Sequence, residues 1–426
     1  MTGLCILWRN SHKRGKYEMQ QERFDVVIVG GGMVGATLAC ALGDSGLQVC
    51  LLESRYPEAF DGSQPHDIRV SALSLASQAI LEQLGVWQGI EQRRACPYRR
   101  MKVWEQSAQL AATEFSADEI GQSCLGHIVE NRIIQLALLE RVSQFENVTL
   151  ICPAEVTEID YAPASSLITL SNGRMLAARL LIAADGGDSK VRQAAGIGVT
   201  SWDYDQQAFV ASVTTAYPQQ DITWQQFTPS GPLAFLPLSG THASLVWYNT
   251  AEGVQQLRAL TSAELKSAFM QSFPAELGEV QEILATGSFP LRRQHAKTYV
   301  AEGVALVGDA AHMIHPLAGQ GVNIGLLDAA ALAEVLTEAV AEQQEISSLA
   351  VLRAYEKQRK AHNLLMMQTM DLFYRVFSNN RMPLRLLRNI GLGLAEKAGP
   401  LKQKVIQLAT GLDGRLPALA RGESLR

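Results

Sequence analysis

The folded part of the chain begins with an alternation of apolar runs and a helical segment. Residues 24–29 (FDVVIV) end in glycines, residues 33–42 follow as a predicted helix, and residues 48–52 (QVCLL) form a second apolar run closed by Glu53. Continuous runs of β-branched and aliphatic residues are typical of strands that are covered on both faces. Residues 24–53 therefore predict one β-α-β unit of a parallel sheet.

The pattern changes twice further along the chain. Apolar residues recur at helical spacing over 71–84 and 131–145, which predicts two amphipathic helices. Short strand-like runs lie between and after them, at 101–104, 148–151, 156–159, 167–170 and 180–183. From 202 to 248, alternating aromatic-rich segments broken by Pro-Gly turn signals predict an antiparallel sheet with one exposed face. A helix at 263–272 and a strand near 283–289 complete it.

The pattern of a buried strand followed by a helix then returns, with a short buried strand at 304–307, a long helix at about 321–341 and helical sequence from 349 onward. We therefore expect an α/β protein with a Rossmann-like lobe, an inserted antiparallel-sheet lobe that faces the substrate, and a helical C-terminus. The expected units are a disordered tail (1–23), a discontinuous first lobe (24–199 and 289–348), the inserted sheet lobe (200–288), a helical segment (349–411) and a second disordered tail (412–426).

Composition narrows the function classes. The 426 residues are 47% hydrophobic and 19% charged. The net charge of −5 gives no overall electrostatic reason to bind nucleic acid. Six cysteines without CxxC pairs indicate reduced thiols in the cytoplasm and no structural zinc. The longest uncharged stretch, 310–327, contains histidines, proline and amides, so it predicts no membrane span. We expect a soluble or peripheral protein.

A glycine motif follows the first predicted strand. Gly30, Gly32 and Gly35 form a GxGxxG between a strand and a helix, where missing side chains let the backbone approach a diphosphate at the helix N-terminus. Glu53, at the end of the second strand, is placed to accept hydrogen bonds from a ribose. A glycine-rich turn that only packs helix on strand is the alternative. The motif predicts dinucleotide binding without separating FAD from NAD.

Two further segments place an aspartate at the carboxyl end of a predicted strand. Asp185-Gly186 lies in ADGGDSKVR (184–192), and Gly308-Asp309 lies in LVGDAAH (306–312). Ligands of open α/β sheets bind at this edge, where a carboxylate can hold a ribityl hydroxyl. Each aspartate alone could equally be a helix N-cap.

In this order, GxGxxG, ADGxxSxVR and GDAAHxxxPxxGQGxN resemble the flavoprotein aromatic hydroxylases, over roughly residues 24–411. The resemblance implies that the first lobe binds FAD, that the Asp185 segment contacts FAD and a docking NAD(P)H, and that Asp309 binds the ribityl chain. The residues expected to bind the cofactor are Gly30, Gly32, Gly35, Glu53, Arg69, Asn131, Asp185, Gly186, Gly308, Asp309 and Asn323. For Arg69, a surface ion pair is the alternative.

Finer segments, including DIRVSAL (67–73), VEN (129–131), WQQFTP (224–229) and FPL (289–291), resemble the ubiquinone-biosynthesis hydroxylases, and most nearly the branch acting on 2-polyprenyl-3-methyl-6-methoxy-1,4-benzoquinol. The resemblance implies hydroxylation of a polyprenyl benzoquinol ring, with NAD(P)H as transient electron donor and molecular oxygen as co-substrate. Reduced FAD and oxygen would form a flavin C4a-hydroperoxide, which the electron-rich ring attacks.

The catalytic environment is expected in the segment after GDAAH. Pro316, Gly319, Gln320 and Gly321 would lie against the flavin ring, with backbone N–H groups stabilising the peroxide. No catalytic base is assigned. His312 and His315 are not expected to bind metal, because no third ligand is evident. The aromatic residues expected to line the quinol pocket, with sheet core as the alternative, are Trp224, Phe227, Phe235, Trp247 and Tyr248.

Residues 371–411 are basic and apolar, which suits peripheral contact with an anionic bilayer, such as the inner face of the plasma membrane, where a polyprenyl substrate would reside. A helical cap with a solvated basic face is the alternative. Two other functions remain open: a flavin-dependent reductase or dehydrogenase of the same fold, and a non-catalytic flavoprotein subunit of a quinone-synthesis complex.

Overall fold

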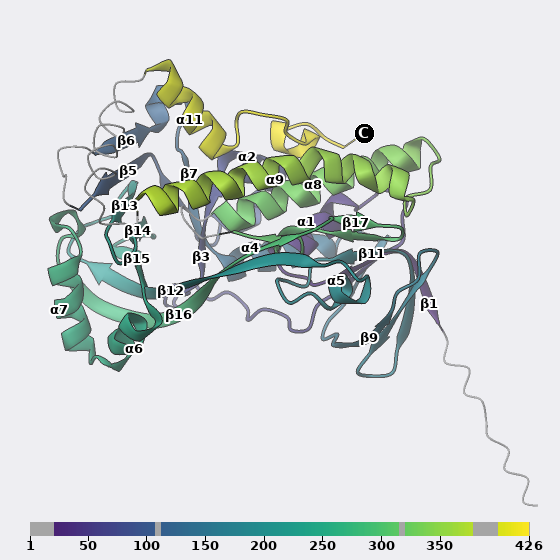
Figure 1. Cartoon of the computed structure of the whole chain (residues 1–426), viewed down its shortest axis with the longest axis horizontal. Coiled ribbons are helices and arrows are strands. Elements are labelled where there is room, and N and C mark those ends of the chain that lie inside the picture. The colour runs from purple at the N-terminus through teal and green to yellow at the C-terminus, as the bar shows by residue number, and fades with distance from the viewer. Residues whose placement is uncertain (1–20, 107–111, 315–319, 378–398, 426) are drawn as a thin grey trace, which may run out of the picture.

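The computed structural model describes residues 21–106, 112–314, 320–377 and 399–425 (Figure 1). Its first layer is a sheet with a parallel centre, in the order β17-β18-β11-β1-β2-β8, with β10 and β9 as a hairpin beside β11. The strands are β1 (Glu22–Val29), β2 (Val49–Leu52), β8 (Val148–Ile151), β9 (Val156–Asp160), β10 (Ser166–Leu170), β11 (Met175–Ala183), β17 (Val300–Ala301) and β18 (Val304–Leu306).

Helices bury this sheet because its strands are apolar on both faces. All four residues of β2 are buried, as are Val26, Val27 and Ile28 of β1. The helix α1 packs against both α4 and α8, and α9 packs on α8. The helices of this lobe are α1 (Met33–Ala41), α2 (Leu75–Gln83), α3 (Trp87–Glu91), α4 (Asn131–Val142), α5 (Lys190–Ala194), α8 (Gln320–Ala341) and α9 (Leu349–Phe377).

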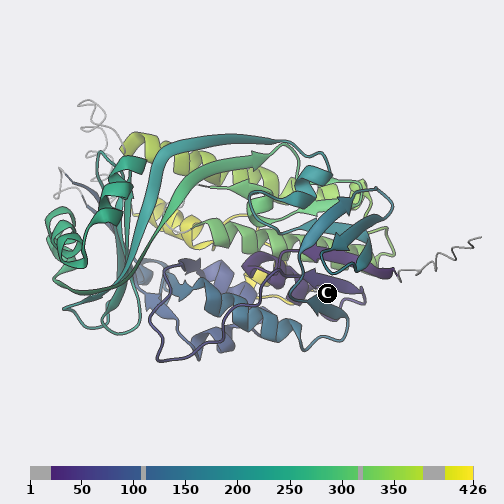
Figure 2. The same cartoon turned by 90° about the horizontal axis from the view of Figure 1, so that it is seen from below.

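The second layer is a mainly antiparallel sheet in the order β19-β16-β12-β15-β14-β13-β5-β6. Its two longest strands, β12 and β16, pair with each other and run from one lobe into the other (Figure 2). The strands are β5 (Arg100–Glu105), β6 (Thr113–Ser116), β12 (Val199–Thr215), β13 (Ile222–Phe227), β14 (Leu233–Pro237), β15 (His242–Asn249), β16 (Val280–Ala296) and β19 (His312–Met313).

The two faces of this sheet differ because side chains alternate along each strand. Phe209, Ala211 and Val213 of β12 point into an apolar cluster with Leu265 and Phe269. This cluster lies under α6 (Ala251–Ala259) and α7 (Ser262–Ser272). The residues between them on β12 face the other way, toward the first lobe.

A small sheet, β3 (Val70–Ser74), β7 (Gly126–Glu130) and β4 (Cys96–Tyr98), lies beside the first lobe in the order β3-β7-β4. Here the structure corrects the predicted helix at 71–84, since residues 70–74 are strand and only 75–83 are helix. The Ser74 side chain accepts a hydrogen bond from the Ser77 N–H and so begins the helix.

The C-terminal region corrects a second expectation. Residues 412–426 are not a disordered tail as far as 425, because the 3-10 helix η5 (Ala418–Arg421) buries three apolar side chains and packs on α2 and α8. Upstream, α11 (Pro400–Thr410) contacts the 3-10 helix η1 (Ala117–Ile120). Most of the expected N-terminal tail, residues 1–20, lies outside the described residues.

The expected fold class, an α/β lobe with an inserted antiparallel sheet and a helical C-terminus, is confirmed. The inserted sheet is larger than 200–288, because it also takes in β5 and β6 from upstream, the end of β16, and β19 downstream. Within the described residues, no helix combines the length and apolarity that crossing a bilayer requires.

Candidate cofactor and substrate site

The turn after β1 is built from glycines for two different reasons. At Gly30, φ is +105°, and an added Cβ would lie 2.3 Å from the backbone oxygen of Ala184. At Gly35, a Cβ would lie 1.9 Å from the backbone oxygen of Gly30. At Gly32, by contrast, a Cβ would meet no protein atom within 4 Å. The first two glycines are needed to fold the turn, whereas the space at Gly32 is open for a ligand.

The helix α1 starts at this opening. Gly32 is its N-cap, and no side chain caps this end in the described structure. The first-turn N–H groups and the positive end of the helix dipole therefore suit a diphosphate. Glu53 lies against the same turn, since a Cβ on Gly31 would lie 2.7 Å from the Glu53 Cβ. One Glu53 oxygen accepts hydrogen bonds from the Arg55 N–H (3.0 Å) and the Ser54 hydroxyl (3.1 Å).

Asp185 follows β11 and has an unused oxygen. Its Oδ2 accepts a hydrogen bond from the Val191 N–H at 3.2 Å, whereas its Oδ1 is buried without a hydrogen-bond partner among the described residues. Leaving a buried acceptor unpaired typically costs about 1–3 kcal/mol, which a ligand hydroxyl would offset. The N-cap of α5 is Ser189, so Asp185 is not an N-cap. Next to it, Gly186 has φ +84° and open space.

The turn at Gly308 and Asp309 follows β18. Gly308 has φ +59°, and an added Cβ would lie 3.2 Å from a Val34 methyl, so this turn packs on α1. The N-cap here is Val307, so Asp309 is not an N-cap either. Asp309 is exposed by its solvent-accessible surface, although protein atoms crowd its carboxyl. Burial raises the pKa of its carboxyl, and the charges of His312 and Arg69 act in the opposite direction. Arg69 and Asp309 therefore belong to one electrostatic site.

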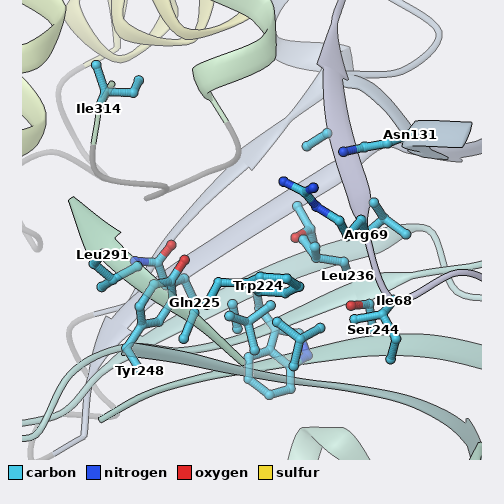
Figure 3. A pocket seen from close by; sticks show the side chains of 18 of the residues that line it. Ile68, Arg69, Asn131, Trp224, Gln225, Leu236, Ser244, Tyr248, Leu291 and Ile314 are labelled. Carbon is cyan, nitrogen blue, oxygen red and sulfur yellow. The ribbon is translucent and has the colours of Figure 1, made fainter. Parts of the chain in front are cut away.

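A cavity of about 340 Å³ lies against the inner face of the second sheet, and Arg69, Asn131 and Met313 also line it. Alternate small and apolar residues of that sheet line it: Ala208, Val210, Ala234, Leu236, Ser244, Val246 and Leu291. Arg69 and Asn131 lie together at one end, and Tyr248 and Leu291 lie at the other (Figure 3). The Arg69 guanidinium carbon is 5.4 Å from the centre of the Phe289 ring, and the Asn131 oxygen accepts the Ser71 hydroxyl at 2.7 Å.

Of the aromatic residues expected in the pocket, Trp224 and Tyr248 line it. The Trp224 ring, however, is stacked on Phe235 with 5.4 Å between ring centres. Phe235 and Trp247 point into the core under α6 and α7, and Phe227 is buried away from the cavity. Sheet core, the alternative for these aromatic residues, therefore describes Phe235 and Trp247. The missed lining residues were signalled by the alternation of positions such as 234, 236, 244 and 246.

The described part of the cavity wall contains no Asp, Glu, His or Cys. Its titratable residues are Arg69, Arg292, Tyr98 and Tyr248, and burial raises the pKa of both tyrosines well above its ordinary value. At neutral pH these phenols are protonated, so they can donate hydrogen bonds but do not serve as bases. No catalytic base was assigned from the sequence, and the described lining residues include no carboxylate or imidazole that could act as one.

The segment expected beside the flavin ring is described only in part, because Pro316 and Gly319 lie outside the described residues. Gln320 is the first residue of α8. An added Cβ on Gly321 would meet no described atom within 4 Å. Asn323 is buried and bonds to β3 and α2, so its described contacts hold the protein together. His312 contacts Asp328, and no metal-binding cluster occurs among the described residues.

The sequence model of a family described as "FAD binding domain" matches residues 23–370. The chain belongs to this family. The glycine turn, the uncapped start of α1 and the unpaired Asp185 oxygen all suit the family's cofactor, so the expected FAD is confirmed, as is the expected class of FAD-dependent monooxygenase.

Several curated relatives of this chain are named as hydroxylases or monooxygenases. The 3-demethoxyubiquinol 3-hydroxylase of Escherichia coli (strain K12) is 44% identical, covering 92% of this chain and all of the relative. Ubiquinone hydroxylase UbiL of Rhodospirillum rubrum is 38% identical, over 94% and 93% of the two chains. The human ubiquinone biosynthesis monooxygenase COQ6 is 35% identical, over 96% of each. The resemblance to ubiquinone-biosynthesis hydroxylases is thus confirmed.

Among solved structures, p-nitrophenol 4-monooxygenase PnpA from Pseudomonas putida DLL-E4 superposes with a TM-score of 0.74 over 93% of this chain and all of the other. At 21% identity, this similarity shows a shared fold.

Proposed function

We propose that this protein is an FAD-dependent hydroxylase that oxidises the ring of a polyprenyl benzoquinol in ubiquinone biosynthesis, with NAD(P)H as electron donor and molecular oxygen as co-substrate. One observation carries the proposal: an apolar cavity on the inner face of the second sheet has Arg69 and Asn131 at one end (Figure 3), and the charge of Arg69 acts on Asp309 of the FAD-binding turn. The relatives named as ubiquinol or ubiquinone hydroxylases support this substrate class.

The cofactor residues divide the FAD molecule between them. The open space at Gly32 and the start of α1 receive the diphosphate, and Glu53 takes the adenosine ribose. Asp185 and Asp309 hold the ribityl side, with Arg69 beside Asp309. Bound FAD supplies two-electron reduction by NAD(P)H and the activation of oxygen. Pro316, Gly319, Gln320 and Gly321, at the start of α8, would lie against its ring.

The cavity then does three things for a quinol. Its aliphatic wall excludes water from the reacting ring. Its protonated tyrosines, Tyr98 and Tyr248, can donate hydrogen bonds to ring oxygens. A hydroquinone ring is already electron-rich, which favours its attack on an electrophilic oxygen donor, and no catalytic base is assigned. A cavity of this size suits a ring with the first part of its prenyl chain, so the rest of the chain would extend outside.

Peripheral membrane contact through 371–411 would give access to such a substrate. In the described part of this segment, α11 exposes Val405 and Leu408 beside Lys404. An exposed apolar and basic surface suits an anionic bilayer. Lys402 instead pairs with Glu119 at 3.2 Å, which ties α11 to η1. We also expect the protein to belong to a quinone-synthesis protein complex, and the same surface would then contact a partner protein.

Labelled oxygen tests the proposal. The purified, FAD-loaded protein is given NAD(P)H, isotopically labelled oxygen and a short-chain demethoxy-type quinol, and the product is analysed by mass spectrometry. Incorporation of one labelled atom into the ring is expected. Oxidation of NAD(P)H with a reduced or dehydrogenated product and no label would instead show a reductase or dehydrogenase. No turnover of any quinol by well-folded yellow protein would favour the non-catalytic subunit.

A further inference from the structure

A carboxylate lies entirely inside the first lobe, on the long helix α8. Asp328 is fully buried, and so are its partners His312, Arg359 and Asn363. Its Oδ1 accepts hydrogen bonds from the Arg359 Nε–H at 2.8 Å and the Asn363 Nδ2–H at 3.0 Å. Its Oδ2 contacts His312 Nε2 and accepts a hydrogen bond from the Gly308 N–H at 3.3 Å. One side chain thus joins α8 to three other segments.

Burial alone would raise the pKa of Asp328, but the charges of His312 and Arg359 and the hydrogen bonds hold that pKa below its ordinary value. The group is therefore a buried carboxylate at neutral pH. Buried ion pairs often contribute less stability than well-packed apolar residues of similar volume. Since the fully buried residues of α8 other than Asn323 and Asp328 are apolar, stability alone gives a weak reason for this charge.

The two contacts of Oδ2 lead to the two halves of the site. Gly308 precedes Asp309, which faces the ribityl side of the cofactor in the proposed function. His312 precedes Met313 and Ile314, which line the substrate cavity. Both segments therefore contact the same oxygen atom of one carboxylate.

We propose that Asp328 is a positioning residue, which acts through Gly308 and His312 to hold the FAD-binding turn and the substrate-cavity wall in register. Arg359 and Asn363, from α9, orient the carboxylate from its other side. The part that concerns the substrate rests on the proposed function, whereas the part that concerns FAD needs only the family's cofactor.

The test separates positioning from stability. In Asp328→Leu/Arg359→Leu both charges are removed together, so the apoprotein should melt within about 5 °C of wild type. Its FAD dissociation constant should still rise about tenfold or more, the visible spectrum of bound FAD should shift, and kcat should fall more than KM rises. Should this variant fail to fold, Asp328→Asn, which keeps the shape and loses the charge, is put through the same measurements.

Three variants serve as references. His312→Gln keeps an N–H donor that can reach Asp328, so it should keep most of the wild-type FAD affinity. His312→Leu has no such donor and should lose FAD affinity. Glu338→Gln removes an exposed charge from α8 and should change nothing. Wild-type FAD affinity and an unchanged flavin spectrum in the folded Asp328 variants would overturn the inference. Because FAD binding is measured without substrate, absence of hydroxylation by the wild-type enzyme would count against the proposed function alone.

Discussion

The side-chain oxygen of Asn323, in the first turn of α8, accepts a hydrogen bond from the backbone N–H of Ser74 at 2.9 Å and another from the Ser77 hydroxyl at 2.7 Å. Its amide group donates to the Ala72 oxygen at 2.8 Å. One buried side chain therefore fastens the start of α8 to the junction of β3 and α2. The sequence suggested Asn323 as a cofactor ligand, but its described bonds are all made within the protein.

Replacing Asn323 with alanine should destabilise the apoprotein. Three buried polar groups would lose their partner, and the free energy of unfolding should fall by about 2–3 kcal/mol. Urea unfolding of the apoprotein measures this directly. Glu338→Ala, on the exposed face of the same helix, is the matched control and should stay within about 0.5 kcal/mol of wild type. A stable Asn323→Ala apoprotein with weak FAD binding would instead support a direct contact with the cofactor.

Gly32→Ala should separate cofactor binding from folding. The residue has φ −66°, which alanine tolerates, and its Cβ would meet no protein atom. The apoprotein should therefore melt like wild type, but the methyl group would occupy the approach of the diphosphate and weaken FAD binding about tenfold or more. Titration of the apoprotein with FAD, followed by flavin fluorescence, measures the change.

Gly35→Ala is the informative comparison for that variant. Its Cβ would lie 1.9 Å from the Gly30 oxygen, so this protein should be poorly folded even without FAD. If Gly32→Ala bound FAD as tightly as wild type, the diphosphate would have to lie away from the start of α1.

Features of the fold with short-range causes could be predicted from the sequence. The strand of residues 24–29 is β1, the segment 48–52 contains β2, and the helix between them is α1, because their apolar runs and glycines act locally. The helix predicted at 71–84 failed at its start for the opposite reason. Leu73 has the spacing of a helix, yet it pairs in β3 with His127 of β7, and that partner lies far along the chain.

The pocket could be predicted only in outline for a related reason. One face of the second sheet packs under α6 and α7, and the other face lines the cavity. Aromatic content alone did not show which residues belong to the cavity face. Phe235 and Trp247 pack under α7, and smaller residues such as Ala234 and Val246 leave room on the cavity side. Alternation along each strand separates the two sets once one position has been placed.

Ala234→Phe should block the quinol. Ala234, the second residue of β14, lines the cavity, so a phenyl group there would fill space that the ring needs. We expect kcat/KM for the quinol to fall about tenfold or more, with FAD affinity unchanged. Ala216→Phe, at an exposed position just after β12, is the control. Unchanged kinetics for Ala234→Phe would place the substrate outside this cavity.

Acid should destabilise the protein through a buried histidine. The His66 ring is tilted against the ring of His242 with 4.6 Å between ring centres, and burial, with the charges of Arg94 and His242, lowers the pKa of His66 to about 4. The unfolded chain has an ordinary histidine pKa near 6.5, so between about pH 6.5 and 4 it binds a proton that the folded state does not. Stability therefore falls as the pH falls through this window and changes little from this cause above it.

His66→Phe removes that titration while keeping a ring, and the buried His66 Nε2 has no partner to lose among the described residues. The loss of unfolding free energy between pH 7.5 and pH 5 should be smaller in this variant than in wild type by about 1–2 kcal/mol. Urea unfolding at the two pH values measures it, with a substitution of the exposed Gln48 by alanine as the control. An equal loss in wild type and His66→Phe would mean that His66 is already protonated in the folded protein at pH 5, or that the pair opens to solvent before the protein unfolds.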